Sequence, residues 1–338
     1  MIIQRSSSTF LLALSVAILF CTGGCGESLY KDLRPVTYRL KWLINTSVAG
    51  GLYADAHGIF ADHGLRVTIK EGGPERDSIK ELELGHAQFG VASADQVIRA
   101  VSKGAPVVVI AQLFQVNPLQ WIYRPEKTCI DTVQDLKGKT IGVTYGGNDE
   151  TIMRALLTKW KIKNKDVKLF SVRYDYTPFY DGEVDLWPVY QNAEGMVIGE
   201  KLRKAGERAG FFNPDDFGAR FVANSVITTE RMLKERSDIV HKFTKALLQG
   251  WREALNPANC GKAVKTICRF DKDTPVHIIR KQLQATRILM KPSPEVEIGR
   301  IDTKAWIETE RIMLEQKLIA RRISVKRILR HYAQIASR

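Results

Sequence analysis

The sequence has few cysteines, and none of them lies in a pattern that binds a metal. Five cysteines occur among 338 residues, and no two form a Cys-x-x-Cys pair. No group of histidines and cysteines has the spacing of metal ligands either. The sequence therefore predicts neither a metal centre nor a bound cofactor.

Motifs that recognise nucleic acid are also missing. We find no zinc-finger spacing, no aromatic motif of RNA-binding sheets and no Arg-Gly tract. The 51 Lys and Arg residues exceed the 37 Asp and Glu residues, which gives a formal net charge of +14. Such a charge could attract nucleic acid, a membrane surface or an acidic ligand. Without a recognition motif we interpret it as a solvated basic surface, and we expect no nucleic-acid partner.

The one long apolar run, Phe10 to Cys21, is too short for a comfortable membrane span, which needs about 20 residues. It follows a start that contains Arg5 and no acid, and it precedes small residues and Cys25, an arrangement typical of a secretory signal. Small residues directly before a cysteine resemble a bacterial lipoprotein processing site. This resemblance implies a signal over residues 1–24, a lipid on Cys25 and a tether over residues 25–35. Cleavage to a free protein and an uncleaved anchor remain the alternatives.

Export would place the other cysteines in an oxidising compartment. Cys260 and Cys268 flank a predicted helix over residues 262–267, so they form either one disulfide or two buried thiols. Cys129 would then have no partner.

Predicted strands and helices alternate from Tyr38 onward. Strands are expected over residues 38–43, 65–69 and 88–92, and helices over 52–63 and 76–84. This alternation predicts a parallel, doubly wound α/β sheet. Ligands bind such sheets beyond the carboxyl ends of the strands. The first candidates for a binding site are therefore four residues at those ends: Trp42, Asn45, Ser93 and Asp95.

A second α/β unit follows a turn at residues 124–127, with strands expected over residues 140–143, 167–172 and 184–189. A return strand over residues 221–228 and a helical end, whose last helix is expected over residues 324–336, complete the expected chain. We therefore predict lobe 1 over residues 36–125 plus 223–338 and lobe 2 over 126–222. Crossings at residues 123–127 and 219–225 would act as hinges of a cleft.

Each candidate binding residue also has a structural interpretation. Trp42 can stack on a planar heterocycle or pack in the core. Asn45 offers a donor and an acceptor to a ring edge, or serves the turn. Tyr53 is a ligand contact or a core residue. Ser93 and Asp95 lie where a helix begins, and Ser93 is most simply its N-cap.

The second lobe supplies two further groups of candidates. Backbone N–H groups of Tyr145, Gly146 and Gly147 could bind a phosphate or sulfonate before a helix, or form an ordinary turn. Tyr190, Asn192 and Glu194 follow a strand and could meet Trp42 across the cleft. A carboxylate at Glu194 favours an amine-bearing ring over an anion, and its alternative is a solvated residue at a helix start.

Several short motifs resemble the SsuA/TauA and thiamine-pyrimidine family of solute-binding proteins of ABC importers. In chain order they are Trp42-x-x-Asn45, Gly51-Leu52-Tyr53-Ala54, His57-Gly58-Ile59-Phe60, His63-Gly64-Leu65, Gly85-His86-Ala87-Gln88-Phe89-Gly90, Asp135-Leu136-Lys137-Gly138-Lys139 and Gly182-Glu183-Val184-Asp185. The resemblance implies a two-lobed periplasmic binding protein of type II. Such a protein hands a small molecule to a membrane permease.

The family also contains a branch that makes the thiamine pyrimidine from its own histidine and pyridoxal phosphate. That branch needs a lysine and, four residues later, a histidine, where this sequence has Ala92 and Gln96. A Schiff base requires an amine, which Ala92 lacks. The resemblance therefore implies the frame of the synthase without its chemistry.

We expect a monomeric, non-catalytic binding protein for a small nitrogen heterocycle, similar to a thiamine-precursor pyrimidine. We expect it at the periplasmic face of a bacterial envelope, anchored through Cys25 and partnered by an ABC permease. The alternatives are a binding protein for taurine, a sulfonate or another small anion, a synthase-like enzyme, and a ligand sensor for a membrane partner.

Overall fold

A computed structural model describes residues 33–331. The predicted signal, Cys25 and most of the predicted tether lie outside the described residues. Within residues 33–331, no helix is both long enough and apolar enough to cross a membrane.

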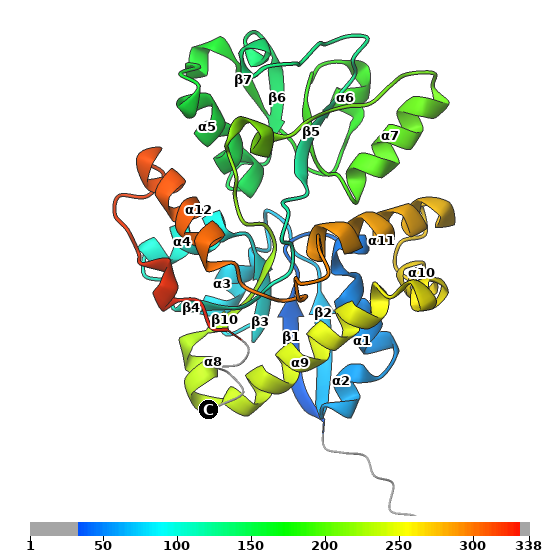
Figure 1. Cartoon of the computed structure of the whole chain (residues 1–338), viewed down its shortest axis with the longest axis vertical. Coiled ribbons are helices and arrows are strands. Elements are labelled where there is room, and N and C mark those ends of the chain that lie inside the picture. Colours follow the sequence, from blue (N-terminus) through cyan, green and yellow to red (C-terminus); the bar gives the residue numbers. More distant parts are fainter. Residues whose placement is uncertain (1–32, 332–338) are drawn as a thin grey trace, which may run out of the picture. The chain divides into compact units, whose positions relative to one another are not determined.

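The larger sheet has five strands in the order β2-β1-β3-β10-β4 (Figure 1). Their bounds are β1 Arg34–Arg39, β2 Leu65–Lys70, β3 Phe89–Ala92, β4 Val107–Gln112 and β10 Ser225–Thr229. β1 pairs in parallel with β2 and β3, as predicted, but the return strand β10 runs antiparallel to β3 and β4. The sheet is therefore mixed, because the chain re-enters it from the opposite end.

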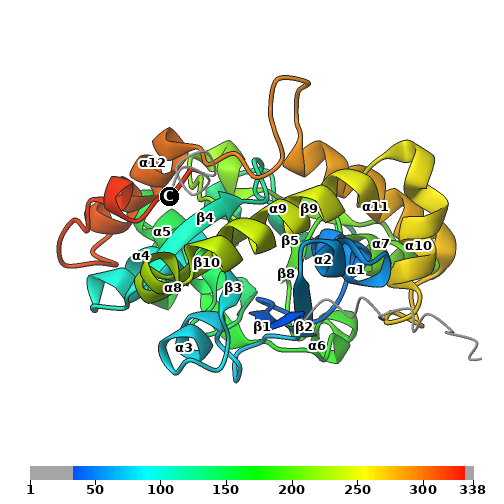
Figure 2. The same ribbon diagram turned by 90° about the horizontal axis from the view of Figure 1, so that it is seen from below.

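Helices cover this sheet on both sides (Figure 2). The early ones are α1 Ala49–Ala56, α2 Ile59–Asp62, α3 Ser78–Glu83 and α4 Ala94–Ser102. The late ones are α8 Glu230–Glu235, α9 Ser237–Ala254, α10 Cys260–Ile267, α11 Val276–Met290 and α12 Thr303–Glu315. The predicted helix over residues 52–63 is interrupted at Gly58, whose φ of 73° lies in the left-handed region.

The second lobe contains two small sheets. One has the strand order β8-β5-β9, from β5 Leu119–Tyr123, β8 Trp187–Tyr190 and β9 Gly210–Phe212. The other pairs β6 Thr140–Val143 with β7 Lys168–Ser171 in parallel. Its helices are α5 Asn148–Lys159, α6 Thr177–Asp181 and α7 Glu194–Lys204.

The first crossing between the lobes differs from the prediction. β5 is hydrogen-bonded to β8 and β9, so it belongs to the second lobe, and the chain crosses between Gln112 and Leu119. The predicted boundary at residue 125 and hinge at 123–127 therefore come too late. The sequence pattern of an apolar strand is the same whichever sheet it joins. Only its hydrogen-bonded partner strands show to which lobe it belongs.

The predicted C-terminal helix over residues 324–336 is wrong for the described part of the chain. Only a short 3-10 turn, η6 Val325–Arg327, forms there. Leu329 then forms a bridge to Val109 of β4, and the Arg330 N–H donates to the Val109 carbonyl at 2.8 Å. Residues 328–330 thus pack against β4 of the first lobe as extended chain and not as a helix.

Cys260 and Cys268 are free thiols, so the disulfide alternative is wrong. Cys260 begins α10 and Cys268 caps its end, so the two lie eight positions apart along a helix. At 1.5 Å per residue this is about 12 Å, well beyond the ~4.4–6.8 Å between the Cα atoms of a disulfide.

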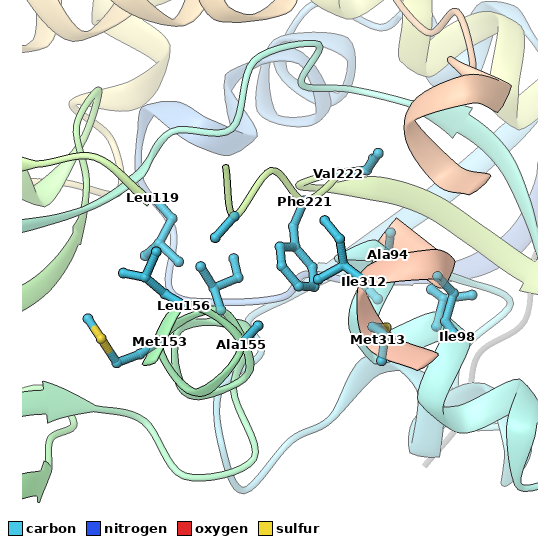
Figure 3. Packing of buried hydrophobic residues seen from close by; sticks show 14 of the residues in the cluster. Ala94, Ile98, Leu119, Met153, Ala155, Leu156, Phe221, Val222, Ile312 and Met313 are labelled. Carbon is cyan, nitrogen blue, oxygen red and sulfur yellow. The ribbon is translucent and has the colours of Figure 1, made fainter. Parts of the chain in front are cut away.

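One apolar core continues across the crossings (Figure 3). Phe221, on the return crossing, packs in the same cluster as Met153 and Leu156 of α5 and Ile312 and Met313 of α12. Each of these side chains is at most 7% exposed. Burial of apolar surface therefore joins the two lobes where the chain passes between them.

Two glycines let α1 and α9 pack closely. A Cβ on Gly250 would lie 2.3 Å from the Gly50 carbonyl oxygen, whereas a Cβ on Gly261 of α10 would meet nothing within 4 Å. We expect Gly250→Ala to lower the free energy of unfolding by about 1–3 kcal/mol, as overpacking does. Gly261→Ala should raise it by about 0.5–1 kcal/mol, because alanine favours the helix. Urea denaturation of both variants measures this, and equal effects would contradict the packing argument.

Candidate functional site

A cavity of about 240 Å³ lies between the two lobes. The first lobe lines it with the loop after β1, the turn at Gly73 and Pro74, and Asn224. The second lobe contributes the turn from Thr144 to Asp149, the strand β8, and Glu194. The volume is just below the ~300–1,000 Å³ typical of pockets for drug-sized ligands, so the cavity suits a small solute.

Most of the predicted site residues meet at this cavity. Because β1 ends at Arg39, Trp42 and Asn45 lie in the loop after the strand. The predicted residues that line the cavity are Trp42, Asn45, Tyr145, Gly146, Gly147, Tyr190 and Glu194.

Four predicted residues do not line the cavity. Tyr53 is buried in α1 and stacks on His57, with 4.0 Å between the ring centroids. Ser93 caps α4, where its hydroxyl donates to Gln96 at 2.8 Å. Asp95 and Asn192 are both fully buried. Their predicted ligand contacts gain no support from the geometry.

Asn192 instead holds the second lobe to the first. Its amide nitrogen donates to the hydroxyls of Ser47, at 3.2 Å, and Thr286, at 2.7 Å. The main-chain carbonyl oxygen of Asn192 accepts from the Thr46 hydroxyl at 3.2 Å, and the Gln282 side chain donates to the next main-chain carbonyl, that of Ala193. The segment over residues 190–194 is thus fixed to the first lobe on both sides.

Trp42 lies at one edge of the cavity and is partly exposed. Its ring meets Tyr174 of the second lobe at 5.1 Å between centroids, tilted by 40°. Beside this pair, Arg173 forms an ion pair with Glu75 across the lobes. Further aromatic surface comes from Tyr176 and Trp187, whose centroids are 5.5 Å apart. The cavity therefore offers ring faces to a flat ligand.

Asn45 and Glu194 meet across the cavity. The Ser47 N–H donates to Asn45 Oδ1 at 2.8 Å, which fixes the amide so that its Nδ2 donates to Glu194 Oε1 at 3.0 Å. The Tyr190 N–H donates to the other carboxylate oxygen at 3.3 Å. Burial raises the pKa of Glu194, while these hydrogen bonds and Lys41 oppose the rise.

The Gly146–Gly147 turn does not present free N–H groups to an anion. The Gly146 N–H donates to Glu150 at 2.7 Å, and the Gly147 N–H donates to the Thr144 carbonyl at 2.8 Å. The buried carboxylate of Asp149 accepts from the Thr144 N–H at 2.6 Å in the same turn. The N-terminus of α5 is thus occupied by the chain's own acids.

Several cavity residues were not predicted. Lys41, directly before Trp42, donates to Asn148 Oδ1 at 2.6 Å and to the Tyr190 hydroxyl at 2.9 Å. Its place beside a predicted ligand residue could have signalled it. Asn148, directly after the predicted Gly147, had the same signal. Tyr176, Trp187 and Asn224 had none, because only the packing of the lobes brings them to the cavity.

The sheets, the crossings and the interlobe cavity define a class of protein: the two-lobed periplasmic-binding-protein fold of type II. The chain belongs to the NMT1/THI5-like family, whose model matches residues 45–259.

Known proteins similar to this chain include two binding proteins of low identity. The formylaminopyrimidine-binding protein of Halalkalibacterium halodurans is 24% identical over 307 residues, covering 88% of this chain and 91% of that protein. The riboflavin-binding protein RibY of Chloroflexus aurantiacus is 22% identical over 314 residues, covering 87% and 84%.

Among solved structures, the alkanesulfonate-binding protein SsuA from Xanthomonas axonopodis pv. citri, bound to MOPS, aligns with a TM-score of 0.67. It is 18% identical and covers 89% of this chain and 98% of its own. At that identity the likeness shows the fold alone.

The positions that would carry synthase chemistry hold no amine or imidazole. Ala92 is buried in β3, and the Gln96 side-chain oxygen accepts from the N–H and the hydroxyl of Ser93. Among residues 33–331, no group of three or more His, Cys, Asp or Glu side chains could hold a metal.

Burial raises the pKa of Asp149 from 3.8 to about 6. The folded protein therefore binds a proton on the Asp149 carboxyl more tightly than the unfolded protein does. The resulting contribution to the free energy of unfolding is fully present below pH 4 and is lost as the pH rises through 6. The shift corresponds to about 3 kcal/mol at 1.36 kcal/mol per pH unit.

We therefore expect Asp149→Asn to gain stability relative to the unmodified protein as the pH rises from 4 to 7. Urea denaturation across this range gives the difference. Asp181→Asn removes an exposed carboxylate from α6 and serves as the control. Its difference in free energy of unfolding from the unmodified protein should not change with pH. A stability difference for Asp149→Asn that also stays constant with pH would contradict the raised pKa of Asp149.

Proposed function

We propose that this chain is the extracytoplasmic solute-binding protein of an ABC importer and binds a small amino-substituted nitrogen heterocycle without catalysis. The observation that carries the proposal is the Glu194 carboxylate at the wall of an aromatic cavity, oriented by Asn45 and the Tyr190 N–H. A carboxylate accepts hydrogen bonds, so it pairs with an amino group or a protonated ring nitrogen.

The aromatic side chains support a flat ligand. Trp42, Tyr176 and Trp187 line the same cavity as Glu194, which allows stacking and edge recognition together. The formylaminopyrimidine-binding relative is in keeping with this chemistry.

The small-anion alternative is less well supported. In the turn expected to bind a sulfonate, the N–H groups of Gly146 and Gly147 are both satisfied within the chain. The charged residues lining the cavity are two basic, Lys41 and Arg173, and three acidic, Asp77, Asp149 and Glu194. An anion would also approach the buried Asp149 carboxylate, which repels it.

The synthase alternative lacks the lysine and histidine that its reaction requires. Ala92 offers no amine for a Schiff base and Gln96 no imidazole, so the cavity can bind a pyrimidine but not build one by that route. A permease partner, a lipid on Cys25 and a monomeric state complete the proposal.

Calorimetry of the mature chain with 4-aminopyrimidines, taurine and alkanesulfonates tests the ligand class. We expect binding of an aminopyrimidine, and Glu194→Gln should weaken it by about 10–100-fold, because hydrogen bonds to a charged group contribute about 1.5–3 kcal/mol. Glu200→Gln, on the same helix but outside the cavity, is the matched control and should bind normally. Absence of binding to every aminopyrimidine, or tighter binding of a sulfonate, would overturn the ligand class.

Lipid attachment is tested in a bacterium that expresses the full chain. Labelled palmitate should enter the protein, which should fractionate with membranes, and Cys25→Ser should abolish both. Incorporation that persists in the variant would exclude Cys25 as the lipidated residue.

A further inference from the structure

The last described stretch of the chain carries an exposed cluster of positive charge. Residues 317–330 contain no aspartate or glutamate. Their basic residues are Lys317, Arg321, Arg322, Lys326, Arg327 and Arg330, and all except Arg330 are exposed. We call residues 317–330 the basic segment. Part of the formal net charge of +14 is therefore concentrated on one stretch of surface.

The basic segment is fixed to the first lobe with its charges outward. Its buried apolar side chains, each at most 5% exposed, are Ile319, Val325, Ile328 and Leu329. The buried Glu310 carboxylate of α12 accepts from the N–H groups of Ile323, at 2.7 Å, and Ser324, at 2.9 Å. Because the apolar side chains are packed inside the protein, they are not available to enter a bilayer. A contact made by this surface therefore has to use its cations.

The acids of α12 do not neutralise these cations. Glu308 and Glu315 both form ion pairs with Arg311, and Glu310 is used by the two N–H groups. Within residues 33–331, no ion pair includes a basic side chain of the segment. Exposed charges of one sign produce a local potential, so this surface attracts a partner that carries negative charge.

The sheet topology shows from which end the basic segment reaches the first lobe. β1 is parallel to β3, and β10 is antiparallel to both β3 and β4, so β4 runs in the same direction as β1. Leu329 forms a parallel bridge with Val109, near the start of β4. The segment therefore approaches from the end of the sheet at which β1 and β4 begin. The cavity lies beyond the opposite end, where Trp42 and Asn45 follow β1.

A lipid on Cys25 would hold this end of the sheet near a membrane. β1 begins at Arg34, nine positions after Cys25, and nine residues span at most about 30 Å. Anionic phospholipid headgroups attract Lys and Arg side chains close to the membrane surface, and this attraction needs no apolar insertion. Among polyanions, an anionic lipid surface is therefore the one that the proposed anchor brings within reach.

We propose that the basic segment is a peripheral membrane-binding surface that contacts the headgroups of anionic phospholipids. The contact is electrostatic and reversible, and it adds a second attachment to the proposed lipid on Cys25. Because the cavity lies at the other end of the sheet, a chain attached in this way keeps its ligand site open to solution. The choice of partner rests on the envelope location in the proposed function, but not on the ligand.

Vesicle sedimentation tests this surface in the absence of the lipid. The mature chain carrying Cys25→Ser is mixed with vesicles of phosphatidylcholine, either alone or with phosphatidylglycerol added. We expect sedimentation with the anionic vesicles only, and its loss as salt rises from about 0.05 M to about 0.5 M, because salt screens the attraction. Equal binding to both kinds of vesicle, or no binding to the anionic ones, would overturn the inference.

Removal of charge then assigns the binding to the basic segment. The test variant combines Arg321→Gln, Arg322→Gln, Lys326→Gln and Arg327→Gln. The control variant removes four exposed cations from α10 and α11, on the other side of the first lobe (Figure 1, Figure 2), and combines Lys262→Gln, Lys265→Gln, Lys281→Gln and Arg287→Gln. We expect the test variant to bind anionic vesicles at least about 100-fold more weakly, since each basic residue near the surface contributes a factor of about five. The control should bind within about threefold of the unsubstituted chain, because its cations lie beyond a Debye length from the headgroups.

Both variants lose the same net charge, so a similar weakening of both would overturn the assignment to the basic segment. Melting temperatures establish that each variant is folded, and the comparison of vesicles stands even if one is not. Retention on heparin without binding to phosphatidylglycerol vesicles would identify another polyanion as the partner and would also overturn the inference. None of these results bears on the ligand class, which the aminopyrimidine titration tests separately.

Discussion

The hydrogen bond from Asn45 to Glu194 sets the chemistry of the cavity. It joins a loop that follows the first strand to a helix start nearly 150 positions further along the chain. The Ser47 N–H fixes the Asn45 amide, and the amide in turn fixes the carboxylate. Donors from both lobes orient the Glu194 carboxylate. It is therefore positioned to accept a ligand's hydrogen bond only where the two lobes meet.

The two ends of the cavity differ in how the lobes make contact. At residues 190–194 the contacts are buried, and they involve hydroxyl and amide groups of Ser47, Asn192 and Thr286. At the Trp42–Tyr174 edge the contacting groups are more exposed, and exposed ion pairs such as Arg173–Glu75 contribute little stability. The lobes are therefore held firmly at one place and loosely at the other.

The sequence predicted the parts of the structure that depend on local pattern. The alternation of strands with helices, the N-cap at Ser93 and the position of Asn45 after the first strand could all be predicted from a few neighbouring residues. Trp42 was predicted within a strand over residues 38–43, but β1 ends at Arg39 and Trp42 lies in the loop that follows. The membership of β5 could not, since hydrogen bonds to distant strands decide it. The Gly146 turn was ambiguous for a similar reason, because a sequence does not show which N–H groups are already satisfied.

The burial of Asn192 has a consequence for ligand capture. A binding segment that is ordered before the solute arrives loses little conformational entropy when the solute binds. Ordering a mobile loop would instead cost about 1–2 kcal/mol per residue. The segment over residues 190–194 is already fixed to η1 (Thr46–Val48) and α11. The Glu194 carboxylate, which we propose as a ligand contact, is therefore preorganised. Affinity can then come from a few contacts, which suits a protein whose partner is small.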